Sequence, residues 1–202
     1  MQTSLSSEAV SEQVNLIWFK RDLRVSDHPA LQRAASRGGP VLPVYIIEPD
    51  YWRLPDMSGR HWRFIAECLK DLQHDLTQLG APLVIRVGDA VETLEHLRRQ
   101  FGFTGMTSHI ETGNLWTFGR DRRVANWARA QGVIWTEVPQ SAVTRGLARG
   151  NRWADRRGRF VGGTVAPVPS VLRGLKVEPA AVPTAAALGL TQTFRDTSQT
   201  GG

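Results

Sequence analysis

Residues 14–31 read VNLIWFKRDLRVSDHPAL, and this stretch decides the fold. Residues 14–19 are mostly apolar, too few for a helix, and rich in β-branched and aromatic side chains, which predicts a buried strand. Charged residues follow the strand at its C-terminal end: Lys20, Arg21, Asp22 and Arg24. In an open α/β sheet this is the end of a strand at which ligands bind. Ser26 or Asp27 is expected to cap the next helix, with Pro29 in its first turn.

The alternation of strand and helix continues outward from this stretch. Apolar runs predict further strands at residues 41–47, 82–87, 105–110 and 133–138. Helical spacing predicts helices at residues 27–37, 59–79 and 117–130, and one more that begins after Asp89 as its cap. A β-α repeat of this kind predicts a three-layer, doubly wound α/β fold, Rossmann-like, with a five-stranded parallel sheet.

The chain is expected to divide into three parts. Residues 1–13 are predicted to be a disordered N-terminal tail, and residues 14–140 to form the α/β domain. Residues 141–202 are rich in arginine, proline and glycine, and we interpret them as a linker without a core of its own.

Composition excludes several classes of protein. The 202 residues contain one cysteine, Cys68, which sits in a helical apolar pattern and is expected to be core packing rather than part of a disulfide or metal site. The five histidines show no paired metal spacing, so no metal is expected. No signal peptide or membrane-spanning run is visible, which predicts a cytoplasmic protein with no membrane partner.

Motifs of the common α/β enzymes are also absent from the sequence. The first strand is not followed by GxGxxG, and neither a Walker-type GxxxxGK[ST] nor a GxSxG elbow occurs. An ordinary dehydrogenase, kinase or hydrolase is therefore not expected.

Polar residues after two other predicted strands form a second constellation. Glu48 follows the strand at residues 41–47, and Glu111 and Asn114 follow the strand at residues 105–110. Glu111 and Asn114 are suited to hydrogen-bond a heterocycle in a pocket. The local alternative is that Glu111 pairs with an arginine and Asn114 caps a helix, and spacing alone does not decide between the two.

The opening stretch resembles the DNA photolyase/cryptochrome family. In that family a tryptophan–phenylalanine pair is followed by two basic residues, Asp-Leu-Arg and, later, Asp-Asn-Pro-Ala-Leu. The matching residues here are Trp18, Phe19, Lys20, Arg21, Asp22, Leu23, Arg24, Asp27, Pro29, Ala30 and Leu31. Lys20 stands where arginine is commoner and His28 where asparagine is commoner. The likeness extends over residues 14–163, including the helix that begins near Gly59 and the start of the helix at residues 120–124.

This resemblance implies an N-terminal antenna domain that holds a folate, deazaflavin, flavin or lumazine pigment. Carried over residue by residue, the cofactor-binding positions are Phe19, Lys20, Arg21, Ile47, Glu48, Trp52, Glu111 and Asn114. In the family, FAD and the lesion-binding surface belong to a following helical domain, which implies that domain and damaged DNA as partners of the full-length protein. The resemblance thus implies light-dependent DNA repair or blue-light sensing for the parent, a photo-lyase or a cryptochrome, and no catalysis by this chain alone.

The end of the chain carries a further expectation from the resemblance. Residues 199–202 (QTGG) look like the start of the family's flavin domain, where Gln-Pro-Gly-Gly is common, so the chain is expected to stop at the domain junction.

Two other functions compete with the antenna domain. Residues 141–163 hold one acidic residue and six arginines, which suit a nucleic-acid-binding module: Arg145, Arg149, Arg152, Arg156, Arg157 and Arg159. The same charge is also explained by contact with another domain. A flavodoxin-like or nucleotide-binding protein would share the predicted sheet, but no motif in the sequence favours it.

Overall fold

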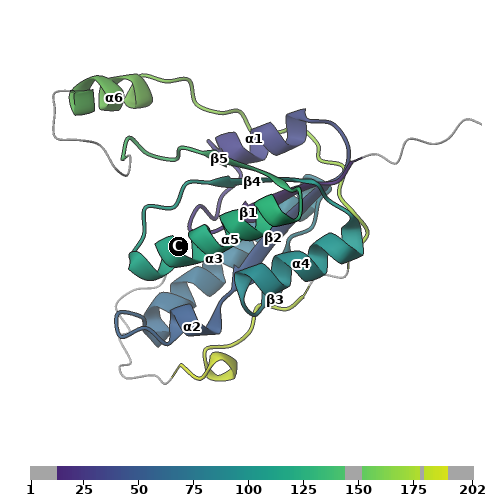
Figure 1. Ribbon diagram of the computed structural model, residues 1–202, viewed down its shortest axis with the longest axis vertical. Helices are drawn as coiled ribbons and strands as arrows, with labels where there is room; N and C mark the ends of the chain where they lie inside the picture. Colours follow the sequence, from purple (N-terminus) through teal and green to yellow (C-terminus); the bar gives the residue numbers. More distant parts are fainter. Residues whose placement is uncertain (1–12, 144–151, 178–179, 191–202) are drawn as a thin grey trace, which may run out of the picture.

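The computed structural model describes residues 13–143, 152–177 and 180–190. Its strands are β1 (Asn15–Phe19), β2 (Val41–Ile47), β3 (Val84–Val87), β4 (Gly105–His109) and β5 (Ile134–Val138). Its helices are α1 (Pro29–Ser36), α2 (Pro49–Trp52), α3 (Gly59–Gln78), α4 (Ala90–Phe101), α5 (Leu115–Ala130) and α6 (Arg152–Val161), followed by the 3₁₀ turn η1 (Ala186–Leu188). Figure 1 shows the sheet between its covering helices, with α6 at the outside of the molecule.

The five strands form one parallel sheet, as the sequence predicts, and the structure gives their order as β3-β2-β1-β4-β5. β1 lies at the centre, paired with β2 on one side and β4 on the other. The chain moves outward from β1 to β3 and then returns to start β4 beside β1. The carboxyl ends of β1 and β4 therefore flank the crevice in which α/β sheets of this kind bind ligands.

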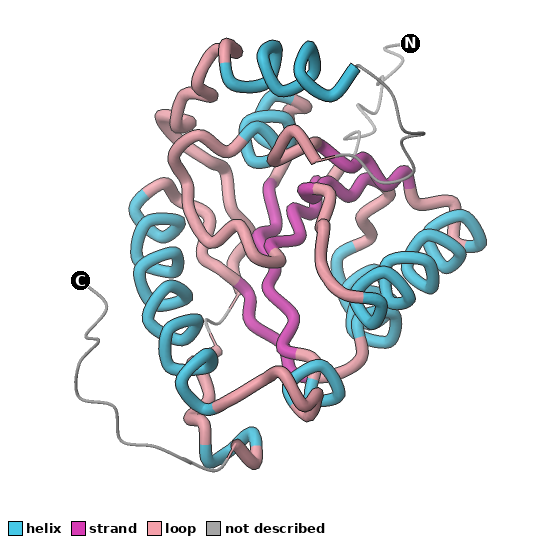
Figure 2. The backbone as a smooth tube through the Cα atoms, turned by 90° about the vertical axis from the view of Figure 1, so that its left-hand side faces the viewer, coloured by secondary structure: helices cyan, strands magenta, loops and turns pink. Residues whose placement is uncertain are grey.

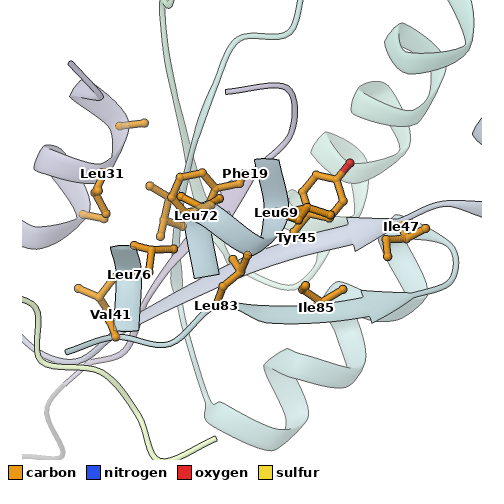
Figure 3. Close-up of a cluster of buried hydrophobic side chains, with 14 of the residues drawn as sticks. Phe19, Leu31, Val41, Tyr45, Ile47, Leu69, Leu72, Leu76, Leu83 and Ile85 are labelled. Carbon is orange, nitrogen blue, oxygen red and sulfur yellow. The ribbon is translucent and has the colours of Figure 1, made fainter. Parts of the chain in front are cut away.

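Alternate residues of β1 feed two separate hydrophobic cores. Ile17 and Phe19 face the side covered by α1 and α3, whereas Leu16 and Trp18 face the side covered by α4 and α5. Figure 2 shows helices on both sides of the strands. Figure 3 shows the first core, in which Leu69, Leu72 and Leu76 of α3 pack over the sheet. Burial on both faces explains why β1 and β2 read as nearly continuous apolar runs.

Two local predictions were wrong, and one short helix was not predicted. Neither Ser26 nor Asp27 caps α1: the cap is His28, whose Nδ1 accepts the Leu31 backbone N–H at 2.9 Å. The short helix α2 was not predicted; it opens with Pro49, since proline fits a first helical turn. Cys68 was expected in the core, but it is only partly buried and belongs to neither hydrophobic cluster.

The described residues after 163 pack along the α/β domain. Leu172 is buried in the core on the α3 side, and its N–H donates to the Leu79 carbonyl at 2.6 Å. Gly174 forms a bridge with Val41, and its N–H donates to the Gly80 carbonyl at 3.0 Å. Farther along, the Trp62 indole donates to the Pro183 carbonyl at 3.1 Å. This segment thus contributes side chains to the domain's own core.

Two further expectations concern the ends of the chain and the membrane. Residues 1–12 of the predicted tail and the terminal residues 199–202 lie outside the described residues. Among the helices that the structure describes, none has the length and apolar character needed to cross a bilayer.

Candidate functional site

A cavity of about 470 Å³ lies at the carboxyl ends of the central strands. This size is typical of sites that hold a small organic molecule. It is bounded by residues that follow β1, β2 and β4 and by the first turns of α3 and α5. The lining residues are Trp18, Phe19, Lys20, Arg21, Tyr45, Ile46, Glu48, Tyr51, Trp52, Met57, Arg60, His61, Phe64, Ile65, Glu111, Thr117 and Arg120.

The structure brings most of the sequence-predicted cofactor residues to this one cavity. Those that line it are Phe19, Lys20, Arg21, Glu48, Trp52 and Glu111. Ile47 does not line it, because strand alternation turns this side chain into the core on the α3 side and presents Ile46 instead. Asn114 does not line it either: its side chain caps α5 by accepting the Thr117 N–H at 3.1 Å. The helix-capping alternative thus describes the contact that Asn114 makes.

The floor of the cavity is built around the buried guanidinium of Arg120. Its Nη1 donates to Glu48 at 2.8 Å, and its Nη2 donates to Glu111 and, at 2.9 Å, to Asp121. The guanidinium also lies 4.9 Å from the centre of the Trp18 ring, a cation–π distance. Burial disfavours the charge on Arg120, but Asp121, Glu111 and Glu48 outweigh it and raise the pKa of this residue. The Glu111–arginine pair that the sequence left open is therefore present.

Glu48 is the least satisfied member of this cluster. Burial raises its pKa to about 6, against the opposing effect of Arg120. Its Oε1 atom is buried without a hydrogen-bond partner among the described residues. The carboxylates around Arg120 outnumber the cations Arg120 and Lys20, so a proton on Glu48 reduces the buried negative charge.

Lys20 is buried beside the cavity and already paired. Its Nζ lies 3.4 Å from Asp121 and 3.8 Å from Glu137. The same ammonium group lies 4.7 Å from the Trp18 ring centre and 5.2 Å from that of Trp135. Lys20 therefore shapes the cavity wall rather than offering an unpaired charge to a ligand.

The other walls of the cavity are aromatic. Tyr51 packs against Trp52 and Trp116, with ring centres 5.6 and 5.4 Å away. Trp52 in turn meets Trp62 edge to face at 4.9 Å. Phe64 lines the cavity although its side chain is 60% exposed. Rigid rings around a recess of this size are suited to stack on a planar heterocycle.

The loop after β1 is held by a second buried cluster, formed by Asp22, His28 and His109. Oδ2 of Asp22 lies 2.6 Å from Nδ1 of His109 and 2.8 Å from Nε2 of His28. The other oxygen, Oδ1, accepts the Lys20 backbone N–H at 2.8 Å. Burial opposes ionisation of Asp22, but the hydrogen bonds from His109 and His28 outweigh it and hold its pKa well below the ordinary value.

The protonation of His28 in this cluster follows from its contacts. Because Nδ1 accepts the Leu31 N–H, the proton of the neutral ring sits on Nε2, next to Asp22. Burial lowers the pKa of His28 even though Asp22 opposes this effect, which agrees with a neutral ring.

The donor atoms of Asp22, His28 and His109 lie within 4.8 Å of one another and are of types that bind metals. Nδ1 of His109 is hydrogen-bonded to Asp22, whereas Nε2 of His28, although 2.8 Å from Asp22, and Nε2 of His109 are buried without a well-directed hydrogen-bond partner among the described residues. The cluster connects His109 at the end of β4 with His28 at the start of α1, through Asp22 in the loop between β1 and α1.

Sequence reasoning missed several residues of the cavity. The predicted cofactor-binding residues did not include Tyr45, Tyr51, Arg60 and Arg120, although all of them line it. A signal was available for Arg60: in a parallel α/β sheet the helix starts lie at the same edge as the strand ends, so the first turn of a predicted helix faces the ligand crevice. For Arg120 the signal was the helix start at residues 120–124, which resembles the family's pattern, but nothing in the sequence distinguishes this arginine from a surface charge on a helix.

The arginine-rich segment is described only in part. Arg145 and Arg149, and the side chains of Arg152 and Arg156, lie outside the described residues. Arg157 and Arg159 are exposed on α6.

Comparisons with known proteins place this geometry in context. Residues 15–145 match the family described as DNA photolyase. Among curated proteins, the chain is 34% identical over 118 residues to "Cryptochrome DASH, chloroplastic/mitochondrial" of Arabidopsis thaliana, covering 55% of this chain and 21% of that protein. It is 29% identical over 108 residues to "Cryptochrome-2" of Gallus gallus, covering 54% and 18%. The matched region thus spans about a fifth of the length of these relatives.

Solved structures share the fold. A class III photolyase from Agrobacterium tumefaciens superposes with a TM-score of 0.71 at 23% identity, covering 91% of this chain and 40% of that one. An archaeal photolyase from Sulfolobus tokodaii, solved with two FAD molecules and described as implying a novel light-harvesting cofactor, gives a TM-score of 0.66 at 17% identity, covering 94% and 44%. These matches do not support the alternative of a nucleic-acid-binding module at residues 145–159.

Proposed function

Since this chain belongs to the DNA photolyase family and is an N-terminal α/β domain of that family, we propose that its cavity holds an antenna pigment. The candidate pigments are a folate, a deazaflavin, a flavin or a lumazine, each a planar heterocycle. Such a pigment absorbs near-ultraviolet or blue light and passes the excitation to an acceptor. The acceptor that we propose is FAD in a helical domain of the parent protein, joined through residues 141–202.

The observation that carries this proposal is an aromatic-walled cavity whose floor charges are already paired. The floor carboxylates Glu48 and Glu111 are both bound to Arg120, so the ring of a bound pigment contacts an ion-paired cluster rather than isolated carboxylates. Tyr51, Trp52 and Phe64 present ring surfaces on which a heterocycle can stack. Stacking and the exclusion of water fix the pigment's orientation, on which energy transfer to a distant acceptor depends.

Under this proposal the domain binds and orients the pigment, whereas the light-driven chemistry takes place in another domain of the parent protein. The chain's own residues supply a cavity, and photolyase chemistry on DNA requires a redox cofactor held against an extruded lesion. We therefore propose that damaged DNA is a partner of the full-length protein and that the domain alone performs no repair.

Titration of the purified chain with pigments tests the proposal. FMN, 5,10-methenyltetrahydrofolate, a 5-deazaflavin and 6,7-dimethyl-8-ribityllumazine are added in turn, and binding is followed by pigment absorption and by quenching of tryptophan fluorescence. At least one of them is expected to bind in the micromolar range or tighter. If all four fail to bind a folded chain, the cavity is not an antenna site.

Two matched variants locate the binding. Phe64→Ala removes a ring from the cavity, and the expected loss of affinity is roughly five- to tenfold, the scale of one aromatic contact. Phe160→Ala removes a ring that is 44% exposed on α6, outside the cavity lining, and affinity is expected to stay unchanged. Equal effects of the two substitutions would place the pigment somewhere else.

A further inference from the structure

The charges around the cavity are distributed unevenly between its floor and its mouth. Lys20 and Arg120 are buried, and each of them has acidic partners. The two lining carboxylates, Glu48 and Glu111, are both bound to Arg120. The floor therefore has no cation left to pair with a charged ligand.

The mouth has the opposite character. Arg21, in the loop after β1, and Arg60, in the first turn of α3, both line the cavity and are exposed. Neither guanidinium forms a salt bridge or side-chain hydrogen bond with any residue that the structure describes. His61, also exposed, lies beside Arg60 in the lining. Two unpaired cations from separate elements thus face the same opening.

Nearby acidic residues do not cancel this charge. Asp50 is bound to Arg53 at 2.8 Å and lies outside the lining. Burial is the main reason why the pKa of Tyr51 is raised, with a smaller contribution from Asp56, which also lies outside the lining.

From this distribution we infer that the cavity selects pigments that carry an anionic tail, a phosphate or a chain of carboxylates, and that Arg21 and Arg60 bind this tail at the mouth. The inference rests on the proposed function, because it specifies which members of the candidate pigments the site accepts. The aromatic walls hold the ring system, and the guanidiniums hold the charged end, for which planar N–H donors are well matched. A pigment with a neutral ribityl chain of the same length can stack its ring on the aromatic walls, but its chain offers no anion to Arg21 and Arg60.

FMN and riboflavin form a suitable pair of probes, because they share the isoalloxazine ring and differ by one phosphate. FMN is expected to bind roughly tenfold more tightly than riboflavin at low salt, since two exposed cations each contribute modestly to one anion. The ratio is expected to shrink as salt is added, because exposed charges are screened. A folate triglutamate compared with its monoglutamate tests the carboxylate form of the tail in the same way.

Substitutions assign the preference to the two arginines. In the double variant Arg21→Gln/Arg60→Gln, the FMN to riboflavin ratio is expected to fall to about twofold or less while riboflavin affinity is kept. Arg63→Gln is the matched control, because Arg63 is exposed on the same helix but does not line the cavity. The control is expected to keep the wild-type ratio.

The outcomes separate the two proposals. If riboflavin and FMN bind equally well, and the two folates do as well, the anionic-tail inference is wrong while the antenna site stands. If a preference exists but survives in the double variant, the mouth arginines do not cause it, and the inference also fails. If no flavin or folate binds the folded chain but the deazaflavin or the lumazine does, the anionic-tail inference is wrong while the antenna site stands. If none of the four pigments binds, both proposals are wrong.

Discussion

Replacing Arg120 with methionine should destabilise the domain severely, because it leaves a cluster of buried acids without their cation. Arg120 binds Glu48, Glu111 and Asp121, and both glutamates are almost fully buried. Methionine has similar length but cannot donate a hydrogen bond. Removal of one partner from a buried ion pair costs about 3–5 kcal/mol. Since small domains have a total stability of about 5–15 kcal/mol, the variant is expected to lose a large part of it.

The assay is urea unfolding followed by circular dichroism at pH 8 and at pH 5.5. At pH 8 the uncompensated carboxylates are ionised, and the full loss of about 3–5 kcal/mol is expected. At pH 5.5 the loss should be smaller, because carboxylates that have lost Arg120 can take up protons. Arg122→Met is the control: Arg122 lies on the same helix but is exposed, and its substitution should change stability by less than about 0.5 kcal/mol.

A compensated variant makes the reasoning refutable even if Arg120→Met fails to fold. Arg120→Met combined with Glu48→Gln and Glu111→Gln removes the buried acids together with the cation, and neutral groups in place of a buried ion cluster are often tolerated. The triple variant should therefore be more stable than the single one at pH 8. A single variant that loses less than about 1 kcal/mol, or a triple variant less stable than the single one, would refute the charge-cluster argument.

Three further predictions concern other contacts. Asp22→Asn should cost about 3 kcal/mol at pH 7 by urea unfolding; because the folded pKa of Asp22 is far below the ordinary value of 3.8, this stability is lost only gradually below pH 3.8, so the difference between variant and wild type should narrow by pH 3 but not close. Glu48→Gln should remove a pH dependence of the free energy of unfolding between pH 4.5 and 6. Because the folded pKa of Glu48 is raised to about 6, the wild type gains about 2 kcal/mol of stability from this group as pH falls through that window. The same pH dependence in the variant would contradict this reasoning. Gly174→Ala would place a Cβ 2.4 Å from the Gly80 carbonyl oxygen and should expose residues 164–190 to protease, whereas Gly158→Ala, which has nothing within 4 Å, should not.

The fold was predictable because a short, local run of residues is enough to predict each strand. Residues 41–47 were predicted as a strand and form β2 with the same bounds, since seven buried residues in a row leave little ambiguity. Boundaries were less certain where a residue has two uses. Pro49 can end a strand or begin a helix, and only the packing of Trp52 into the core favours α2.

The candidate site was predictable only where it depends on strand ends. Glu48 directly follows β2, and Glu111 lies two residues after the end of β4, so the topology places them at one edge of the sheet. Arg120 and Asp22 were harder, because their partners are distant in sequence: Glu48 is 72 residues from Arg120, and His109 is 87 residues from Asp22. Neither pairing leaves a local pattern, and His28 could not be distinguished from an ordinary loop histidine without the fold.

The contrast between floor and mouth explains why substitutions in one cavity should have different consequences. A buried ion cluster is costly to disturb, because each group left without a partner remains desolvated. An exposed arginine can be removed at little cost, because water replaces its partner. Substitution of Arg120 should therefore act mainly on folding, and substitution of Arg21 or Arg60 mainly on which ligand is bound. It follows that relatives can keep the same floor and change their pigment preference at the mouth without loss of stability.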